Sequence, residues 1–141
     1  MIDFNQKFND SYQRVHRDAE GFYSAFYKIL LPKSNEIKQL FDTVDMGHQR
    51  LILQSGLATL VAFSATKQAT DYMFELAKIH STQMKLTAAM YDIWMDALVE
   101  TVRLRDPEFD NQIELGWRAI LSPGIECMKH IDNQHEATGR P

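Results

Sequence analysis

The stretch that matters most for the fold is residues 71–80, which have the sequence DYMFELAKIH. Apolar residues recur there at steps of three and four, and His80 continues the stripe set by Tyr72, Met73 and Leu76. Because side chains at this spacing share one helix face, we predict a helix whose last imidazole points into an apolar interior. Such a side chain is either a core histidine satisfied by a hydrogen bond or a ligand to a group enclosed by the fold.

The composition suits one domain with a bulky interior. A chain of 141 residues can bury a sizeable core without disulfides. Eight Phe, five Tyr, two Trp and seven Met supply large or adaptable side chains that suit the enclosure of a bulky group. The net charge of −4 is spread along the chain without a basic stripe, which argues against nucleic acid as a partner.

Cysteine usage and hydropathy indicate where the protein works. Cys127 is the only cysteine, which excludes an intramolecular disulfide and a multi-cysteine metal site. The first residues lack the basic-then-apolar pattern of a signal peptide, and no apolar run approaches the length that spans a bilayer. We therefore expect a cytoplasmic protein without a membrane partner.

The N-terminal half shows helical spacing with clear breaks. Residues 8–31 predict two successive helices or one bent helix, which Pro32 ends. Ser34 is placed to cap a short helix that reaches Phe41, and Asp45 is placed to cap the next helix.

The helix that Asp45 begins is expected to run to about residue 63, with a polar connection over 64–69. Gly56 lies in the middle of this helix. Since glycine is unfavourable there but lets another backbone approach, we predict a close helix crossing at Gly56.

The second half predicts two more helices. One begins near residue 85 and ends at the break before Pro107, and the last contains Pro123, which predicts a kink. We expect a single domain over residues 1–132 and a mobile polar tail over 133–141.

Patterns typical of other fold classes are missing from the sequence. No segment alternates with period two, and there is no glycine-rich nucleotide loop, zinc-protease helix or nucleophile elbow. The sequence predicts an all-α fold of six to eight helices of unequal length, packed orthogonally rather than as a regular bundle.

Four motifs in this order resemble the globins, and within them the bacterial single-domain and flavohaemoglobin-like branch. The motifs are Phe26-Tyr27, Leu40-Phe41, Asp45-Met46-Gly47-His48-Gln49 and Leu76-Ala77-Lys78-Ile79-His80. Their separations are close to globin register: 14 residues from Tyr27 to Phe41, 31 from Gln49 to His80 and 11 from His80 to Tyr91. The resemblance implies a three-over-three helical sandwich that binds haem b (iron protoporphyrin IX).

The resemblance also implies roles for individual residues. His80 would ligate the iron, while its other ring nitrogen donates to a backbone carbonyl of the preceding turn, such as that of Leu76. Phe41 would wedge against the haem. The other residues expected to contact the haem are Leu53, Leu76, Met84, Leu86, Tyr91 and Trp94.

On the opposite, distal side, Tyr27 and Gln49 resemble the tyrosine and glutamine pair that donates hydrogen bonds to bound dioxygen. Leu53, one turn after Gln49, would press on the ligand from the same face. The start of this helix is shifted relative to the family pattern, so His48 competes with Gln49 for the inward position and would ligate the iron directly if it faced inward.

Some family features have only approximate counterparts. Tyr91 resembles a proximal tyrosine that orients the iron-bound histidine together with a carboxylate, for which Glu126 and Asp132 are the nearest candidates. Arg50 and Lys85 are candidates to pair with the haem propionates.

The resemblance implies reversible binding of dioxygen, NO and CO at a ferrous haem. One alternative is an NO dioxygenase working with a separate reductase, because the reductase domain of flavohaemoglobins is not part of the sequence. Another is a gas-sensing or interaction module. The sequence does not assign an oligomeric state.

Overall fold

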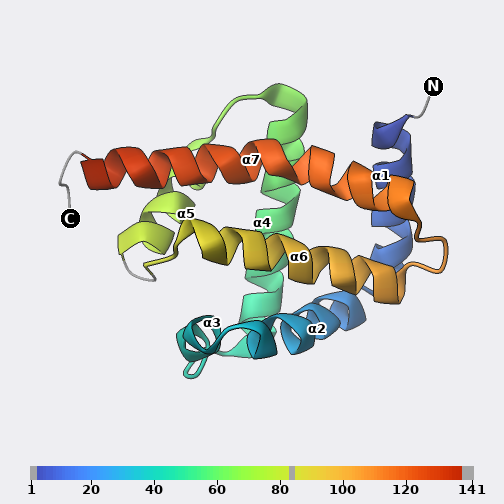
Figure 1. Cartoon of the computed structure of the whole chain (residues 1–141), viewed down its shortest axis with the longest axis horizontal. Helices are drawn as coiled ribbons and strands as arrows, with labels where there is room; N and C mark the ends of the chain where they lie inside the picture. Colours follow the sequence, from blue (N-terminus) through green and yellow to red (C-terminus); the bar gives the residue numbers. More distant parts are fainter. Residues whose placement is uncertain (1–2, 83–84, 138–141) are drawn as a thin grey trace.

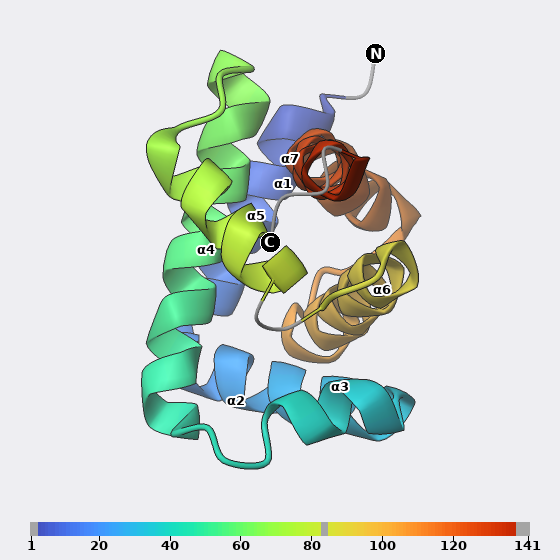
Figure 2. The ribbon, with the colours of Figure 1, turned by 90° about the vertical axis from the view of Figure 1, so that its left-hand side faces the viewer.

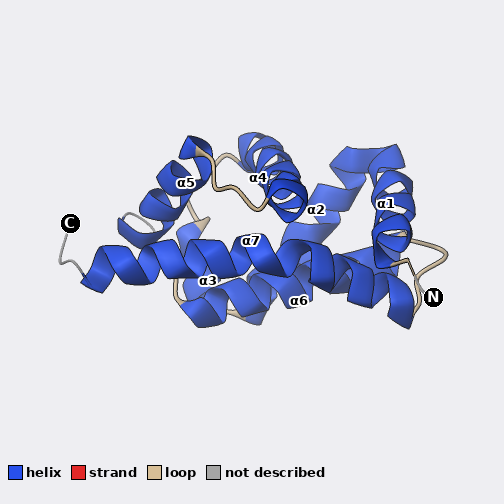
Figure 3. Cartoon of the chain, turned by 90° about the horizontal axis from the view of Figure 1, so that it is seen from above, coloured by secondary structure: helices blue, strands red, loops and turns tan. Residues whose placement is uncertain are grey.

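The structure is a computed structural model that describes residues 3–82 and 85–137, with side chains described except at 81, 82 and 132–137. In these ranges the chain consists of helices and short connections without a strand (Figure 3), which confirms the predicted all-α class. The helices are α1 (Phe4–Val15), α2 (Ala19–Leu30), α3 (Asn35–Leu40), α4 (Met46–Thr66), α5 (Asp71–Thr82), α6 (Ala88–Arg105) and α7 (Asn111–Ala137). Two short 3-10 turns, His16–Asp18 and Leu31–Lys33, flank α2.

The helices pack in two layers. Helices α6 and α7 lie side by side, and α4 crosses them at a steep angle (Figure 1). Helix α7 contacts α1, α4 and α5 of the opposite layer, and α2 packs on α6 (Figure 2). This is the predicted three-over-three arrangement. Within the described ranges, no helix is long and apolar enough to cross a membrane.

Caps set the helix starts as predicted. The Ser34 hydroxyl accepts from the Ile37 amide at 3.2 Å and begins α3, and the Asp45 carboxylate accepts from the Gly47 amide at 3.0 Å and begins α4. The chain from residue 8 to 31 contains two helices, separated by the turn at His16–Asp18, where Asp18 caps α2.

Two boundaries differ from the prediction. Helix α4 continues to Thr66, beyond residue 63, because nothing in this stretch breaks it before Lys67 closes it with a left-handed φ of 57°. Helix α6 starts at Ala88 rather than at 85, because Thr87 provides the cap by accepting from the Met90 amide at 3.2 Å.

Helix α7 is continuous across Pro123 and extends to Ala137, into the segment for which the sequence predicts a tail. Residues 138–141 of that segment lie outside the described residues, so the mobility of the tail stays a prediction.

Glycines mark the helix crossings, but Gly56 does not. A Cβ built on Gly56 meets no atom within 4 Å, so the predicted crossing there is wrong. The close approaches are on α7 instead. A Cβ on Gly124 would lie 2.6 Å from Leu60 Cδ2 of α4, and one on Gly116 would lie 3.1 Å from the Phe4 carbonyl oxygen of α1. Five glycines lie within the described helices, and only packing shows which of them lie at a crossing.

A buried carboxylate joins the two ends of the chain. Asp106, 2% exposed, accepts from the Ser11 hydroxyl at 2.6 Å and from Arg14 Nε at 2.7 Å. Trp117 Nε1 donates in turn to Ser11 Oγ at 2.9 Å, and the Glu108 amide donates to Asp106 at 2.9 Å. Burial raises the pKa of Asp106, but the hydrogen bonds from Arg14, Ser11 and the Glu108 amide outweigh it, so the pKa is lowered overall.

His16, in the turn before α2, bonds to a residue of α1 and to a residue of α2. Its ring is partly buried, with Nδ1 2.7 Å from the Tyr12 carbonyl oxygen and Nε2 2.7 Å from the Tyr23 hydroxyl. Burial lowers the pKa of His16, so the neutral ring is favoured. This cluster packs around Trp117 and positions the start of α2, which carries Tyr27.

We expect Asp106→Asn to lower the free energy of unfolding by about 3 to 5 kcal/mol at pH 7, because it removes the buried carboxylate and leaves the partly buried Arg14 guanidinium with only the exposed Glu108 as counter-ion, at 3.5 Å. The pKa of Asp106 is lower in the folded chain, so its contribution is present above its unfolded pKa of about 3.9 and is lost as the pH falls through the folded value. Urea denaturation followed by circular dichroism at pH 7 and pH 3 measures both effects. The control is Asp10→Asn, an exposed acceptor of Gln6, for which we expect a change within about 0.5 kcal/mol. Equal losses for the two variants would contradict the prediction.

We expect Gly56→Ala to raise the free energy of unfolding of the cofactor-free protein by about 0.5 to 1 kcal/mol, since the methyl group enters open space and alanine favours the helix. Gly124→Ala is the matched comparison, and its methyl group must displace Leu60 Cδ2, which offsets the same gain. Urea denaturation should therefore rank Gly56→Ala above Gly124→Ala, and the reverse order would show that the crossing lies at Gly56 after all.

Candidate functional site

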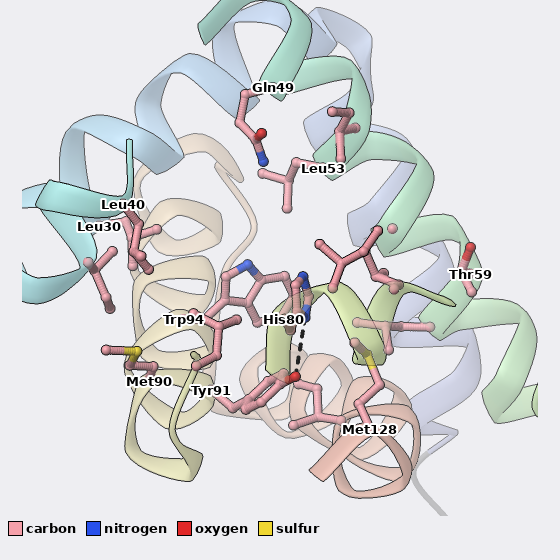
Figure 4. Close-up of a pocket in the computed structure, with 18 of the residues that line it drawn as sticks. Leu30, Leu40, Gln49, Leu53, Thr59, His80, Met90, Tyr91, Trp94 and Met128 are labelled. Carbon is pink, nitrogen blue, oxygen red and sulfur yellow. Dashed lines mark hydrogen bonds between the residues drawn. The ribbon is translucent and has the colours of Figure 1, made fainter. Parts of the chain in front are cut away.

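A cavity of about 310 Å³ lies between α4 and the helices α5, α6 and α7, and reaches α2 and α3 at one end (Figure 4). Its volume falls in the range of small-molecule sites, about 300–1,000 Å³. The wall is made of apolar, aromatic and neutral polar side chains. The residues that line it are Tyr27, Leu30, Ile37, Leu40, Phe41, Gln49, Ile52, Leu53, Gly56, Thr59, Leu60, Met73, Leu76, Ile79, His80, Leu86, Met90, Tyr91, Trp94, Ile125 and Met128.

His80 enters the cavity from α5. The inner face of this helix carries the fully buried Met73 and Ala77, while Tyr72, which the sequence placed on the same stripe, is 44% exposed. The inward stripe is therefore Met73, Leu76, Ala77 and His80, at steps of three, one and three. In Figure 4 the imidazole faces Leu53 and Gln49 across the cavity.

The hydrogen-bond partner of His80 differs from the prediction. Its Nδ1 lies 3.2 Å from the Tyr91 hydroxyl on α6, not on the carbonyl of Leu76 (Figure 4). The carbonyl oxygen of His80 itself accepts from the Leu86 amide at 2.9 Å, which ties the end of α5 to the segment before α6. With Nδ1 engaged, Nε2 is the nitrogen available to a group in the cavity.

Burial determines the charge of His80. Desolvation lowers the pKa of its imidazole from about 6.5 to about 4, so the ring is neutral at pH 7. A neutral imidazole carries a lone pair on one nitrogen, which is what a metal ion requires of a histidine ligand. The ring therefore has the protonation state of a ligand.

The opposite wall carries a polar pair. Gln49 Nε2 donates to the Tyr27 hydroxyl at 3.1 Å, which joins α4 to α2. Tyr27 is 5% exposed, and burial raises its pKa to about 12, although the bond from Gln49 lowers it. The phenol therefore keeps its proton at pH 7. The Phe41 ring meets the Tyr27 ring edge-on, with centroids 5.5 Å apart, and Leu53 lies one turn beyond Gln49.

The structure brings most of the sequence-predicted site residues to this one cavity. His80, Tyr27, Gln49 and Leu53 line it. Five other predicted residues line it as well: Phe41, Leu76, Leu86, Tyr91 and Trp94. Met84 lies outside the described residues.

Other candidates lie elsewhere. His48 is exposed at the start of α4 and does not line the cavity. Arg50 lines a separate hollow beside Tyr23. Glu126 is exposed and accepts from Lys129, and the side chain of Asp132 lies outside the described part.

Several wall residues were missed by the sequence analysis. Leu30, Leu40 and Met90 lie on one side of the cavity and Met128 of α7 lies at its base (Figure 4), and Ile37 and Ile125 line it as well. The apolar stripe of α7 contains Leu121, Ile125 and Met128, so the signal was present, but it could not be told from ordinary core packing.

The cavity offers one nitrogen donor rather than a chelating set. Across residues 3–82 and 85–137, no group of three or more His, Cys, Asp and Glu side chains could hold a metal ion. A metal could be held here only by His80 together with a ligand that brings its own donors. The apolar wall suits a large apolar group of that kind.

The order and packing of the helices define the class of the molecule: the chain has the globin fold. A similar solved structure is that of a Pseudomonas aeruginosa protein described as structurally highly homologous to a human hemoglobin. The two share 28% sequence identity with a TM-score of 0.83, over 92% of this chain and 98% of the other. No family model and no curated protein matches the sequence.

Proposed function

We propose that this globin binds haem b through His80 and holds dioxygen or another diatomic ligand, NO or CO, beside Tyr27 and Gln49. The observation that carries the proposal is the placement of a neutral imidazole in an apolar cavity, opposite the hydrogen-bonded pair of the buried Tyr27 and the partly buried Gln49.

The residues present fit a haem group. Nε2 of His80 would bond the iron, and the Tyr91 hydroxyl engages the other ring nitrogen, which holds the orientation of the ring. Phe41, Leu53, Leu76, Leu86 and Trp94 provide apolar surface on several sides of the imidazole. When bound, haem would supply a ferrous iron that binds diatomic ligands.

The distal pair has a defined hydrogen-bond direction. Because Gln49 donates its amide N–H to the Tyr27 oxygen, the hydroxyl proton of Tyr27 is left for a third acceptor. A diatomic ligand with partial negative charge is such an acceptor, and Tyr27 stays protonated since its pKa is about 12. The pair thus provides an aligned donor inside a desolvated site, where a hydrogen bond is stronger than in water.

The proposal is tested by the visible absorption spectrum of the purified protein supplied with haem, reduced under argon and exposed to carbon monoxide. We expect a Soret band that shifts with carbon monoxide in the parent and in His130→Ala, an exposed histidine of α7 that serves as the matched control. In His80→Ala the band should be lost or its position altered. The same spectrum in His80→Ala as in the parent would overturn the assignment of His80, and no Soret band in the parent would overturn haem binding.

We expect Tyr27→Phe to speed the dissociation of dioxygen from the haem-loaded protein by about 10- to 150-fold, because a hydrogen bond to a charged group contributes about 1.5 to 3 kcal/mol. Stopped-flow displacement by carbon monoxide measures the rate. Tyr23→Phe is the matched control: it removes the same hydroxyl one turn earlier on α2, where it contacts His16 rather than the cavity. Equal rates for the two variants would show that Tyr27 does not donate to the ligand.

A further inference from the structure

The rim of the cavity is apolar where it meets solvent. Ile52 of α4 and Ile79 of α5 both line the cavity, yet they are 37% and 39% exposed. On α4, Gln49 and Leu53 line the cavity together with Ile52, which lies three residues from Gln49 and is the exposed member of the set. Two half-exposed isoleucines therefore flank the mouth.

Charged side chains lie away from the mouth of the cavity. Of the described side chains that line the cavity, none is an Asp, Glu, Lys or Arg. Arg50, two residues before Ile52, is carried by the helix turn to the other side of α4, where it lines the hollow beside Tyr23. Lys85 is exposed, next to the wall residue Leu86.

An amphipathic ligand would meet two different environments here. Its apolar body gains from burial against the wall, at roughly 25 cal/mol per Å² removed from water. A carboxylate beside Ile52 and Ile79 would lose hydration without gaining a charged partner among the described residues of the wall, so it would extend past the rim and stay in water.

From this rim we infer that the site retains an iron tetrapyrrole through its apolar body and the His80 bond, and does not recognise the carboxylates of the ligand. The inference rests on the proposed function. It assigns a ligand class wider than haem b, which includes iron porphyrins whose carboxylates are esterified.

The test compares two ligands of the cofactor-free protein. Ferric protoporphyrin IX and its dimethyl ester are titrated in the same water and co-solvent mixture, at low and high salt, and binding is followed by the Soret band. We expect the two dissociation constants to agree within about threefold in both salts. A preference for the free acid above about threefold would overturn the inference, because it would show that a fixed cation holds the carboxylates.

A substitution at the rim shows that the assay detects such a cation. Ile52→Lys places an ammonium group at the mouth and should create a preference for the free acid of up to about fivefold, the upper range of an exposed ion pair, which salt weakens. Ile52→Met is the matched control and should show no preference. The same preference in Ile52→Met and Ile52→Lys would count against the rim as the determinant.

Variants that remove a nearby basic side chain test whether a cation outside the rim holds the carboxylates. Arg50→Gln and Lys85→Gln should leave the rate of haem transfer to an acceptor protein unchanged, and a faster transfer in either variant would overturn the inference. If neither porphyrin binds the parent protein, the proposed function itself fails. If both bind with a strong preference for the free acid, only the present inference fails.

Discussion

The buried carboxylate of Asp106 is the interaction on which the packing of the molecule depends. It binds Ser11 and Arg14 of α1 and the Glu108 amide, and through Ser11 it reaches Trp117 of α7. In a low-dielectric interior these bonds are strong, and the carboxylate would be unstable there without them. The network fixes α1 against α6 and α7 at one end of the molecule. At the other end, α4 and α5 pack against α7 (Figure 1), and the cavity lies there.

Four polar side chains of the cavity wall form two hydrogen-bonded pairs. Tyr27 is matched with Gln49 on one wall and His80 with Tyr91 on the other, so each pair satisfies part of its own hydrogen-bonding capacity. These bonds leave the hydroxyl proton of Tyr27 and Nε2 of His80 for a group in the cavity. Burial keeps both groups neutral, by raising the pKa of the phenol and lowering that of the imidazole. The burial that favours a large apolar ligand therefore also keeps Tyr27 and His80 in the neutral forms in which they would bind it.

Particular residues show how far sequence reasoning reached. The inward position of His80 followed from its spacing after Met73 and Leu76, because helical periodicity is local. Its partner was not predictable in this way, since Tyr91 belongs to another helix and reaches Nδ1 only when α5 packs beside α6. Gly56 was expected at a helix crossing, but the close approaches are at Gly116 and Gly124. The sequence shows where a residue has no side chain, but not which helix packs against it.

The sequence by itself determined the helices, their caps at Ser34 and Asp45, the end of α6 before Pro107 and the residue types of the cavity wall. Each of these depends on contacts within a few residues, or on a pattern that repeats along one helix. Only the tertiary structure decided which residues meet across the cavity, that His48 and Arg50 turn away from it and that Ile52 and Ile79 form its rim. A rotation of a helix by part of a turn separates an inward from an outward side chain, and that rotation is set by packing against the other helices.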